Sequence, residues 1–402
     1  MSKNVPKIRF DGFGGDWEKH KVADFSEDTF GGGTPKTTYA EFWGGTIPWI
    51  QSSDLQEHIV SNVNMKKGIT EIALKKSATK LVPKNSIAIV TRVGVGKLAL
   101  MPFEYTTSQD FLSLSNLKVN EWFGVYSLYN KLQKESHAVQ GTSIKGITKA
   151  ELLEKNIKIP LNLDEQQKIG TFFKHLDDTI ALQQQLVEQQ QKYKKAMLQK
   201  MFPQKGEYVP KVRFDGVSED WEEKSLGHFI QDYTEKTTIQ NQYPMLTSSQ
   251  KYGIILQEEY FADRQVTTNN NIGYFVLPRG YFTFRSRSDN GVFKFNRNDL
   301  IDKGIISYFY PVFKIINGDS NFFLMLLNST IKRQVSLEAE GTGQRVLSLK
   351  KFKNIKILIP SLKEQQKIGA FFKQLDDTIA LYEKKLEDYQ QLKKALLQRI
   401  FV

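Results

Sequence analysis

The sequence lacks cysteine and long hydrophobic runs. Its 402 residues contain no cysteine, which excludes a disulfide framework and any thiolate metal site and fits a reducing compartment. The longest apolar run, Phe322–Leu327, is far shorter than the roughly 20 residues that a membrane-spanning helix needs. The N-terminal segment has no apolar stretch like that of a signal peptide. We therefore expect a soluble, cytoplasmic protein.

Motifs for catalysis and cofactor binding are also scarce. No Pro-Pro pair occurs, whereas amino-methyltransferases hold their target amine with an Asn/Asp-Pro-Pro-aromatic loop. The glycine-rich stretches at residues 11–16 and 30–36 neither follow an apolar strand nor open a helix, so they do not fit a nucleotide-binding loop. The five histidines are scattered without metal-ligand spacing. The sequence predicts a non-catalytic chain that binds no metal and no cofactor of its own.

Two acidic pairs, Asp177–Asp178 and Asp376–Asp377, are the remaining candidates for a metal site. Both fall in segments predicted to be helical, where adjacent side chains point about 100° apart. We interpret these aspartates as solvated surface or as contacts to a partner.

Positive charge is in excess. Lysine and arginine number 56 against 44 acidic residues, which gives a net charge of +12. Such a charge points to a polyanion, either nucleic acid or an anionic membrane surface. A basic protein without a polyanionic partner is the alternative. The length fits two domains, and an aromatic content of 12% argues against disorder.

The dominant feature of the chain is an internal repeat. Residues 165–182 return as residues 364–381 with 16 of 18 identical, and residues 5–18 return as residues 209–222 with 10 of 14 identical. The stretches between these repeats show hardly any similarity. The chain is therefore one unit used twice, with the frame kept and the contents changed. This arrangement suits a molecule that binds two different targets from two equivalent positions.

Each copy of the longer repeat predicts a long helix, over residues 165–201 and 364–401. Apolar residues recur at alternating steps of four and three for about five heptads, which is typical of a coiled-coil seam. Lys194 and Lys393 occupy equivalent positions in the two seams. The helices either pack on each other or face different proteins. The predicted spacer and partner contacts are Ile169, Phe173, Leu176, Ile180, Ile368, Phe372, Leu375 and Ile379.

The two variable regions are predicted to mix helices and strands. In the first, residues 86–92 are strand-like, and residues 121–132 have the apolar spacing of a helix. In the second, residues 273–287 are predicted to form two strands around a turn, and Asp319 or Ser320 could cap a helix. Each region ends in a short strand, a proline and the long helix, so the order of elements matches although the sequence does not.

Basic and polar side chains among aromatic residues are the candidates for nucleic-acid contact. The interleaving is clearest around residues 279–287 and weaker in the first variable region. Arginine can bind a guanine edge or a phosphate with two donors. Alternatively, the aromatic residues are core and the arginines a solvated face. The predicted DNA-binding residues are Lys36, Ser52, Ser53, Arg92, Lys97, Gln109, Thr142, Lys145, Ser248, Ser249, Lys251, Arg279, Arg285, Arg287 and Arg345.

Four stretches carry a family resemblance. They are the repeated segment that begins at Val5, residues 31–55 with their Gly-Gly-Gly-Thr-Pro start, residues 141–160, and the repeated Glu-Gln-Gln-Lys-Ile-Gly motif with its Leu-Asp-Asp continuation. In these stretches the chain resembles the specificity subunit of a type I restriction–modification enzyme. The resemblance implies an α+β fold with two pseudo-symmetric mixed α/β target-recognition domains, separated by two long helices packed as an antiparallel coiled coil. The second variable region departs from the pattern, because it lacks the Gly-Gly-Thr-Pro opening.

The resemblance also implies a division of labour. Each variable domain would read one half of a bipartite site in double-stranded DNA, and the helices would set the spacing. Two modification (methyltransferase) subunits and the restriction (translocase/nuclease) subunits would supply methylation and cleavage, with their own S-adenosylmethionine, ATP and Mg²⁺. The expected segments are a conserved N-terminal segment 1–22, a first target-recognition domain 23–160, a central spacer helix and linker 161–208, a repeat of the N-terminal segment 209–226, a second target-recognition domain 227–360 and a C-terminal spacer helix 361–402.

Two alternatives stay open on the sequence alone. One is a self-sufficient DNA methyltransferase or nuclease with a divergent site, which would methylate DNA without partners. The other is a coiled-coil scaffold that reads no sequence. In that case, exchanging residues 227–345 would leave the methylated site unchanged.

Overall fold

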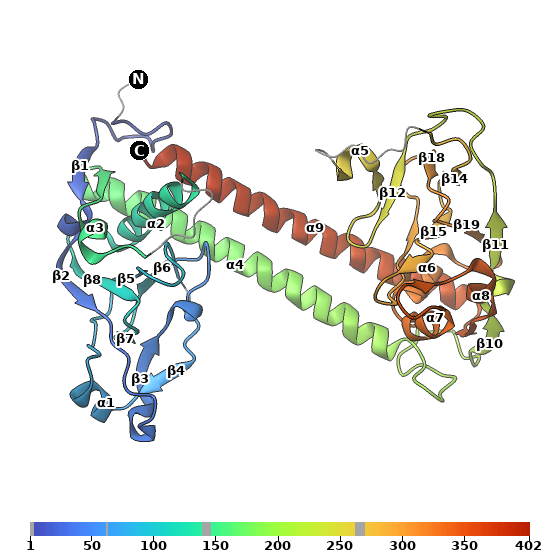
Figure 1. Cartoon of the computed structure of the whole chain (residues 1–402), viewed down its shortest axis with the longest axis horizontal. Helices are drawn as coiled ribbons and strands as arrows, with labels where there is room; N and C mark the ends of the chain where they lie inside the picture. Colours follow the sequence, from blue (N-terminus) through green and yellow to red (C-terminus); the bar gives the residue numbers. More distant parts are fainter. Residues whose placement is uncertain (1–3, 62, 139–145, 262–269) are drawn as a thin grey trace. The chain divides into compact units, whose positions relative to one another are not determined.

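The computed structural model divides into two compact units, each with one variable region and parts of both long helices (Figure 1). Unit 1 consists of Met1–Gln185 and Glu383–Val402, and unit 2 of Leu186–Tyr382. The residues that the structure describes are 4–61, 63–138, 146–261 and 270–402. Among them, no helix is both long and apolar enough to cross a membrane.

Unit 1 is built around an antiparallel sheet with the strand order β2-β8-β5-β6. All five residues of the inner strand β5 are buried. Because side chains alternate between the faces of a strand, Ile87 and Ile89 join the core that contains α2, while Ala88 and Val90 join a second core on the opposite face. The elements of this variable region are β1 (Glu18–Lys21), β2 (Ser26–Gly31), β3 (Trp43–Ile50), β4 (Lys67–Ile69), α1 (Glu71–Lys76), β5 (Ser86–Val90), β6 (Leu98–Met101), β7 (Thr106–Thr107), β8 (Phe111–Leu117), α2 (Glu121–Ala138), α3 (Lys149–Leu153) and β9 (Asn156–Ile159).

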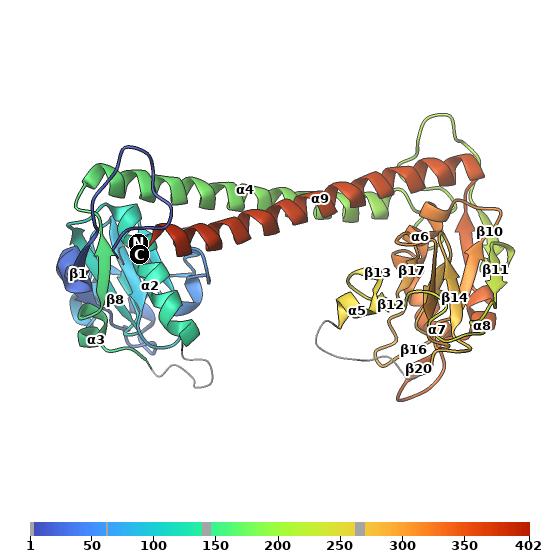
Figure 2. The ribbon, with the colours of Figure 1, turned by 90° about the horizontal axis from the view of Figure 1, so that it is seen from above.

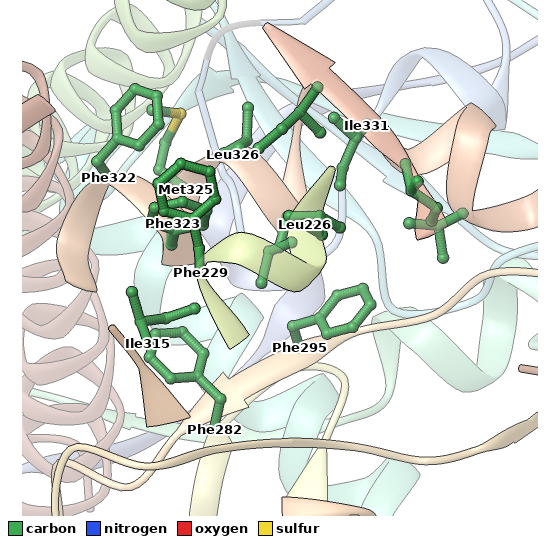
Figure 3. Packing of buried hydrophobic residues seen from close by; sticks show 14 of the residues in the cluster. Leu226, Phe229, Phe282, Phe295, Ile315, Phe322, Phe323, Met325, Leu326 and Ile331 are labelled. Carbon is green, nitrogen blue, oxygen red and sulfur yellow. The ribbon is translucent and has the colours of Figure 1, made fainter. Parts of the chain in front are cut away.

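Unit 2 contains a different antiparallel sheet, with the strand order β11-β19-β15-β17. Its core is rich in phenylalanine, and Figure 3 shows Phe282, Phe295 and Phe322 among the packed side chains. Aromatic rings supply large apolar area to such a core. The elements of this variable region are β10 (Glu222–Ser225), β11 (Ile230–Tyr233), β12 (Leu246–Ser249), β13 (Gly253–Leu256), α5 (Gln257–Tyr260), β14 (Phe275–Pro278), β15 (Phe282–Phe284), β16 (Arg287–Ser288), β17 (Phe295–Arg297), β18 (Lys303–Ile306), β19 (Val312–Ile315), α6 (Ser320–Asn328), α7 (Lys332–Glu338), β20 (Arg345–Val346), α8 (Leu349–Asn354) and β21 (Lys356–Ile359).

The repeated N-terminal segment is joined to the long helix by the same ion pair in both units. In unit 1 the Arg9 guanidinium donates to both oxygens of Glu165 at 2.9 and 2.8 Å. In unit 2 Arg213 donates to both oxygens of Glu364 at 2.9 and 2.6 Å. Both glutamate side chains are 1% exposed, so these two-point, charge-assisted hydrogen bonds are shielded from water. The pairing explains why the Arg-Phe-Asp-Gly and Glu-Gln-Gln motifs recur together.

A glutamine of the repeated motif links the long helix to a helix of the variable region. The Gln166 side chain accepts a hydrogen bond from the backbone N–H of Asn120, and Gln365 accepts one from that of Asp319. Asn120 and Asp319 in turn accept a backbone N–H from the first turn of α2 and α6. Asp319 is therefore the N-cap of α6, one of the two caps considered from the sequence.

The glycine of the same motif allows these helices to approach closely. A Cβ atom on Gly170 would lie 2.6 Å from the backbone nitrogen of Phe123, and one on Gly369 would lie 2.7 Å from that of Phe322. Any side chain at either position would push the two helices apart. The repeated motif is thus a structural joint, made once in each unit.

The long helices α4 (Leu163–Lys200) and α9 (Leu362–Ile400) run antiparallel where they pack within each unit (Figure 2). In unit 1, Phe173 contacts Phe401, and Asp177 further along α4 pairs with Lys393 earlier on α9. The equivalent contacts occur in unit 2. All predicted spacer residues from Ile169 to Ile379 are buried or half-buried. The prediction of an antiparallel coiled coil is confirmed.

Candidate nucleic-acid interface

The loop between β5 and β6 carries basic residues away from the central sheet of unit 1. Gly94 and Gly96 have φ values of 89° and 95°, in the left-handed region that glycine adopts without strain. The Val90 N–H donates to the Lys97 carbonyl at 2.9 Å and closes the loop. Arg92 and Lys97 therefore lie on the two arms of a tight turn, and Arg92 is exposed.

An open cavity of about 980 Å³ lies beside this loop. Arg92 and Gln109 line it. A Cβ atom on Gly94 would lie 4.0 Å from Cβ of Ser52 and 3.7 Å from Cδ of Lys97, so both side chains are neighbours of the loop. The structure thus brings together Ser52, Arg92, Lys97 and Gln109, which lie in separate stretches of the sequence.

One residue of this cavity was not predicted from the sequence, and two predicted residues fall outside the part of the chain that the structure describes. Lys149 lines the cavity and donates to the Thr29 hydroxyl at 2.8 Å. Lys149 was not predicted from the sequence, because nothing in its local spacing distinguishes it from other surface lysines. Ser53 is exposed beside Ser52. Thr142 and Lys145 lie outside the described residues.

The glycine-rich stretch before Thr34 has a structural role. A Cβ atom on Gly32 would lie 1.8 Å from the carbonyl oxygen of Ser108, and the Gly33 N–H donates to the Thr107 carbonyl at 2.9 Å. The stretch packs its backbone directly against the residues that precede Gln109. Because Gly32 and Gly33 have no side chains, the backbone can approach this closely, and the packing holds Gln109 at the cavity.

A surface of lysine and aromatic residues covers β3, β4 and the turn before them. Lys36 Nζ lies 5.5 Å from the centre of the Tyr39 ring, and both residues are exposed. Lys67 Nζ lies 5.9 Å from the Trp43 ring and 5.6 Å from the Trp49 ring. Tyr39 is exposed and Trp43 is half-buried, so their rings can offer stacking beside an ammonium group to a nucleotide, whereas Trp49 is buried at 5% exposure. Lys36 was predicted from the sequence, and Lys67 was not.

The predicted serines of unit 2 hold a hairpin together. Ser248 Oγ accepts a hydrogen bond from the Asn296 side chain at 2.8 Å. Ser249 Oγ accepts from the backbone N–H groups of Lys251 and Tyr252, each at 3.2 Å. These contacts order the β12–β13 turn. Lys251 Nζ lies on that turn, 4.8 Å from the centre of the Tyr252 ring.

The predicted arginines of unit 2 fall into two groups. Arg279 donates to Asp302 at 2.9 Å, and Arg345 donates to two backbone carbonyls, so both guanidinium groups hold neighbouring loops. Arg285 and Arg287 are exposed and two residues apart, which places them on the same side of an extended segment. Arg285 and Arg287 are therefore the better placed pair for an external ligand.

Four phenylalanines near these arginines are core, whereas Phe309, whose ring centre lies 4.9 Å from the Arg287 guanidinium, is 36% exposed. Phe282, Phe284 and Phe295 are fully buried, and Phe293 is 5% exposed. Figure 3 shows two of them inside the cluster. The alternative prediction, that the aromatic residues of this region are core, is therefore confirmed for these four phenylalanines.

One interpretation of the acidic pairs is wrong. Asp177 is not solvated: its side chain is 10% exposed, pairs with Lys393 at 2.5 Å, and accepts a hydrogen bond from the Tyr126 hydroxyl at 2.7 Å. Burial and the Asp177 charge raise the pKa of Tyr126. Asp177 directly follows the seam residue Leu176, so the turn of the helix directs it toward α9. Asp178 pairs with Lys174 on the outer side.

Comparison with known proteins identifies relatives over the full length. The family model for the type I restriction modification DNA specificity domain matches residues 14–190 and again residues 218–390. The MjaIX specificity subunit of Methanocaldococcus jannaschii is 24% identical over 96% of this chain and 92% of its own length. The EcoR124I/EcoR124II specificity subunit of Escherichia coli is 34% identical over 35% of this chain and 36% of its own length. The crystal structure of an S subunit from M. genitalium superposes with a TM-score of 0.64 at 17% identity, covering 99% of both chains.

Proposed function

This chain belongs to the family of type I restriction–modification DNA specificity subunits, and we propose that it reads a bipartite site in double-stranded DNA with one unit for each half-site. One observation carries the proposal. The same joint is made twice from equivalent residues, while the domains that it holds have different sheets. A duplicated frame with different contents presents two different surfaces in equivalent ways, as a split site requires.

In unit 1 we assign the DNA contact to the cavity beside the β5–β6 loop. Arg92 brings positive charge to it and Gln109 brings an amide, while Lys97 lies next to Gly94 of the loop. Arginine forms paired hydrogen bonds with a guanine edge, and glutamine does so with adenine. Ser52, Ser53, Lys36, Thr142 and Lys145 keep their assignment as contacts to bases or phosphates, which position the duplex.

In unit 2 we assign the contact to Arg285 and Arg287, with Lys251 on the neighbouring turn. The exposure of Arg285 and Arg287 leaves their guanidinium groups available to phosphates or base edges. Ser248, Ser249, Arg279 and Arg345 would then support the DNA-binding loops through the hydrogen bonds described above. Under this assignment they contribute to specificity by shaping those loops.

The chemistry is assigned to partner subunits. Two modification subunits would dock on the duplicated frame, where Leu182 and Leu381 are equivalent in the repeat and 62% and 52% exposed. Two exposed leucines in the same repeat position suit two copies of one partner. S-adenosylmethionine belongs to those subunits, and ATP and Mg²⁺ to the restriction subunits, all acting with the DNA in the cytoplasm. The segment boundaries given above stay predictions.

The test is methylation mapping of a genome in cells that express the chain with its modification subunits. Exchanging residues 227–345 for another variable region is expected to change one half-site and to leave the other half-site and the gap unchanged. Arg92→Ala is expected to relax one position of the other half-site, at a cost of about 1–3 kcal/mol in discrimination. Lys80→Ala, an exposed change outside the cavity, is the matched control. An unchanged site after the exchange would favour the scaffold alternative.

The spacing role has its own test. A four-residue insertion after Leu182 adds about 6 Å of helix and is expected to change the gap between the half-sites. The bases of both half-sites should stay the same. Altered bases with a fixed gap would contradict the role of the helices. The purified chain alone, given S-adenosylmethionine and DNA, is expected to show no methylation. Methylation by the chain alone would support the alternative of a self-sufficient enzyme.

A further inference from the structure

Three backbone hydrogen bonds hold the turn before β8 in unit 1. The N–H of Phe111 donates to the carbonyl of Ser108 at 3.3 Å and closes the turn. The N–H of Thr91 donates to the carbonyl of Asp110 at 2.7 Å, and the N–H of Ile147 donates to the carbonyl of Thr91 at 2.7 Å. Thr91 and Ile147 line the cavity beside the β5–β6 loop, so these bonds fix the turn at that cavity.

The same three bonds hold the turn before β19 in unit 2. The N–H of Tyr310 donates to the carbonyl of Ser307 at 2.9 Å and closes the turn. The N–H of Ser286 donates to the carbonyl of Phe309 at 3.0 Å, and the N–H of Leu347 donates to the carbonyl of Ser286 at 2.9 Å. The backbone that presents residues to the cavity in unit 1 is therefore repeated in unit 2, although the two variable regions share hardly any sequence.

This correspondence matches residues of the candidate DNA interface one to one. Arg92 in unit 1 and Arg287 in unit 2 each directly follow the residue that donates to the turn, and both are exposed. The first central residue of the turn is Gln109 in unit 1 and Tyr308 in unit 2. At the second central position, unit 1 has an aspartate and unit 2 has Phe309. The backbone of the site is thus kept, and a polar pair is exchanged for an aromatic pair.

The aromatic pair is exposed at the tip of its turn. Tyr308 is 59% exposed and Phe309 is 36% exposed. Glycine, proline, asparagine, aspartate and serine dominate turns, so formation of the turn does not require two aromatic side chains. The Arg287 guanidinium lies 4.9 Å from the centre of the Phe309 ring and forms no ion pair with any residue that the structure describes. Exposed rings beside such a cation suit DNA, because its phosphates are anionic and its bases carry apolar groups.

The geometry favours contact with the edge of a base over insertion between bases. A ring that enters the base stack needs both of its faces free. The Phe309 ring lies against the Arg287 guanidinium and also has the Tyr308 ring 4.2 Å away, centre to centre, so it does not have two free faces. Insertion would also require the loss of base stacking. In the major groove, the apolar group on a base edge is the 5-methyl group of thymine.

We propose that Tyr308 and Phe309 recognise a thymine, through its 5-methyl group, in the half-site read by unit 2. This inference rests on the proposed function, because it requires unit 2 to read DNA. Packing the methyl group against the two rings removes apolar surface from water on both sides. At the equivalent position unit 1 has the amide of Gln109, which forms hydrogen bonds with a base edge. The same backbone arrangement thus reads a polar edge in one half-site and an apolar group in the other.

The test uses the chain assembled with its modification subunits and duplexes that contain the mapped site. Each thymine in the half-site of unit 2 is replaced in turn by uracil, which lacks only the 5-methyl group. Affinity is measured by fluorescence anisotropy. At one position, uracil is expected to weaken binding by the wild-type chain about fourfold, which corresponds to the burial of one methyl-sized group.

The variants exchange the aromatic pair. Tyr308→Gln with Phe309→Asp places in unit 2 the central residues that the turn of unit 1 already has, so the turn is expected to form. In this variant uracil is expected to have no further effect, because the rings that contact the methyl group are absent. The ratio of thymine to uracil affinity is compared within each variant, so a general loss of affinity cancels. Tyr308→Ala with Phe309→Ala gives the same readout without added charge. The control Tyr208→Ala changes another exposed tyrosine of unit 2 and should keep the fourfold effect.

Loss of the uracil effect in both aromatic variants, with its retention in the control, supports the proposal. The proposal is overturned if no uracil weakens binding, or if the effect persists in the aromatic variants. Aromatic variants that no longer assemble with the modification subunits would assign the rings to a protein partner, which also overturns it. 2-Aminopurine beside the affected thymine reports insertion. A fluorescence rise with the wild-type chain alone would show an opened base step and contradict the methyl contact. Failure of the proposed function is distinguishable, because it would appear as an unchanged site after the exchange of residues 227–345.

Discussion

The repeated Asp–Lys contact between the long helices is made in both units, but in different surroundings. In unit 1, Asp177 and Lys393 are 10% and 8% exposed, and Lys393 also donates to the His58 carbonyl at 3.0 Å and lies over two tyrosine rings. In unit 2, Asp376 and Lys194 form the same pair at 50% and 28% exposure. Identical sequence therefore produces a buried ion pair in one unit and a solvated one in the other.

The variable domain causes this difference. In unit 1, Tyr126 follows Phe123 by three residues and donates its hydroxyl to Asp177. The equivalent residue of unit 2, three after Phe322, is Met325, which has no donor for a carboxylate. The repeat determines which residues pair, and the variable domain determines how strongly the pair contributes to stability. The two units should thus respond differently to the same substitution.

The largest expected difference comes from removing the two lysines. Lys393→Met leaves the Asp177 carboxylate buried without its cation, at a cost of about 3–5 kcal/mol. Lys194→Met breaks a solvated pair, at about 0–1 kcal/mol. Hydrogen exchange followed by mass spectrometry measures the opening free energy of each unit separately. Equal losses in the two variants would show that the burial difference has no energetic consequence.

Tyr126→Phe tests whether the tyrosine is responsible. Removing a buried donor to a carboxylate is expected to lower the stability of unit 1 by about 1.5–3 kcal/mol and to leave unit 2 unchanged. The control Tyr193→Phe alters an exposed tyrosine of α4 and should stay within about 0.5 kcal/mol of the wild type. The same exchange measurement applies. If Tyr126→Phe lowers the stability of unit 1 by less than 0.5 kcal/mol, groups other than the tyrosine hydroxyl are responsible for the buried environment of Asp177.

The glycine joint should behave alike in the two units. Gly170→Ala and Gly369→Ala each force a methyl group against a neighbouring helix backbone, and each is expected to cost roughly 1–3 kcal/mol. Gly343→Ala, where a Cβ would meet nothing within 4 Å, is the matched control. Denaturation midpoints of the full-length variants compare them. If alanine is tolerated at only one of the two positions, the joint contributes differently to the stability of the two units.

The smallest effect concerns the two repeated tryptophans. Trp17 Nε1 donates to Glu165 at 3.3 Å, whereas Trp221 Nε1 is buried without a partner. Replacement by phenylalanine removes similar ring area in both units, but breaks a hydrogen bond in unit 1 alone. Trp17→Phe should therefore cost about 1 kcal/mol more than Trp221→Phe. If chemical denaturation shows that Trp221→Phe costs more stability than Trp17→Phe, this account is refuted.

The frame was predictable from the sequence because its signals are local and periodic. The heptad pattern identified both long helices and their buried seam, and the repeated motifs showed that the chain is one unit used twice. The candidate interface was predicted only in part. Arg92, Lys97 and Gln109 were named from residue type, but Lys67 and Lys149 were missed because neither is distinguished by its neighbours in the chain. The serines of unit 2 were named as ligands, although their hydroxyls hold a turn.

By itself the sequence determined the family, the duplication and the helical seam, because repeats and apolar spacing act between residues close in the chain. Tertiary structure alone decided the surroundings of each charge. Lys393 and Lys194 occupy the same position of the same repeat, and only the packing of a different domain around each excludes or admits water. The cost of a charge depends on that exclusion. Equivalence in sequence therefore ensured equivalent contacts, but not equivalent energies.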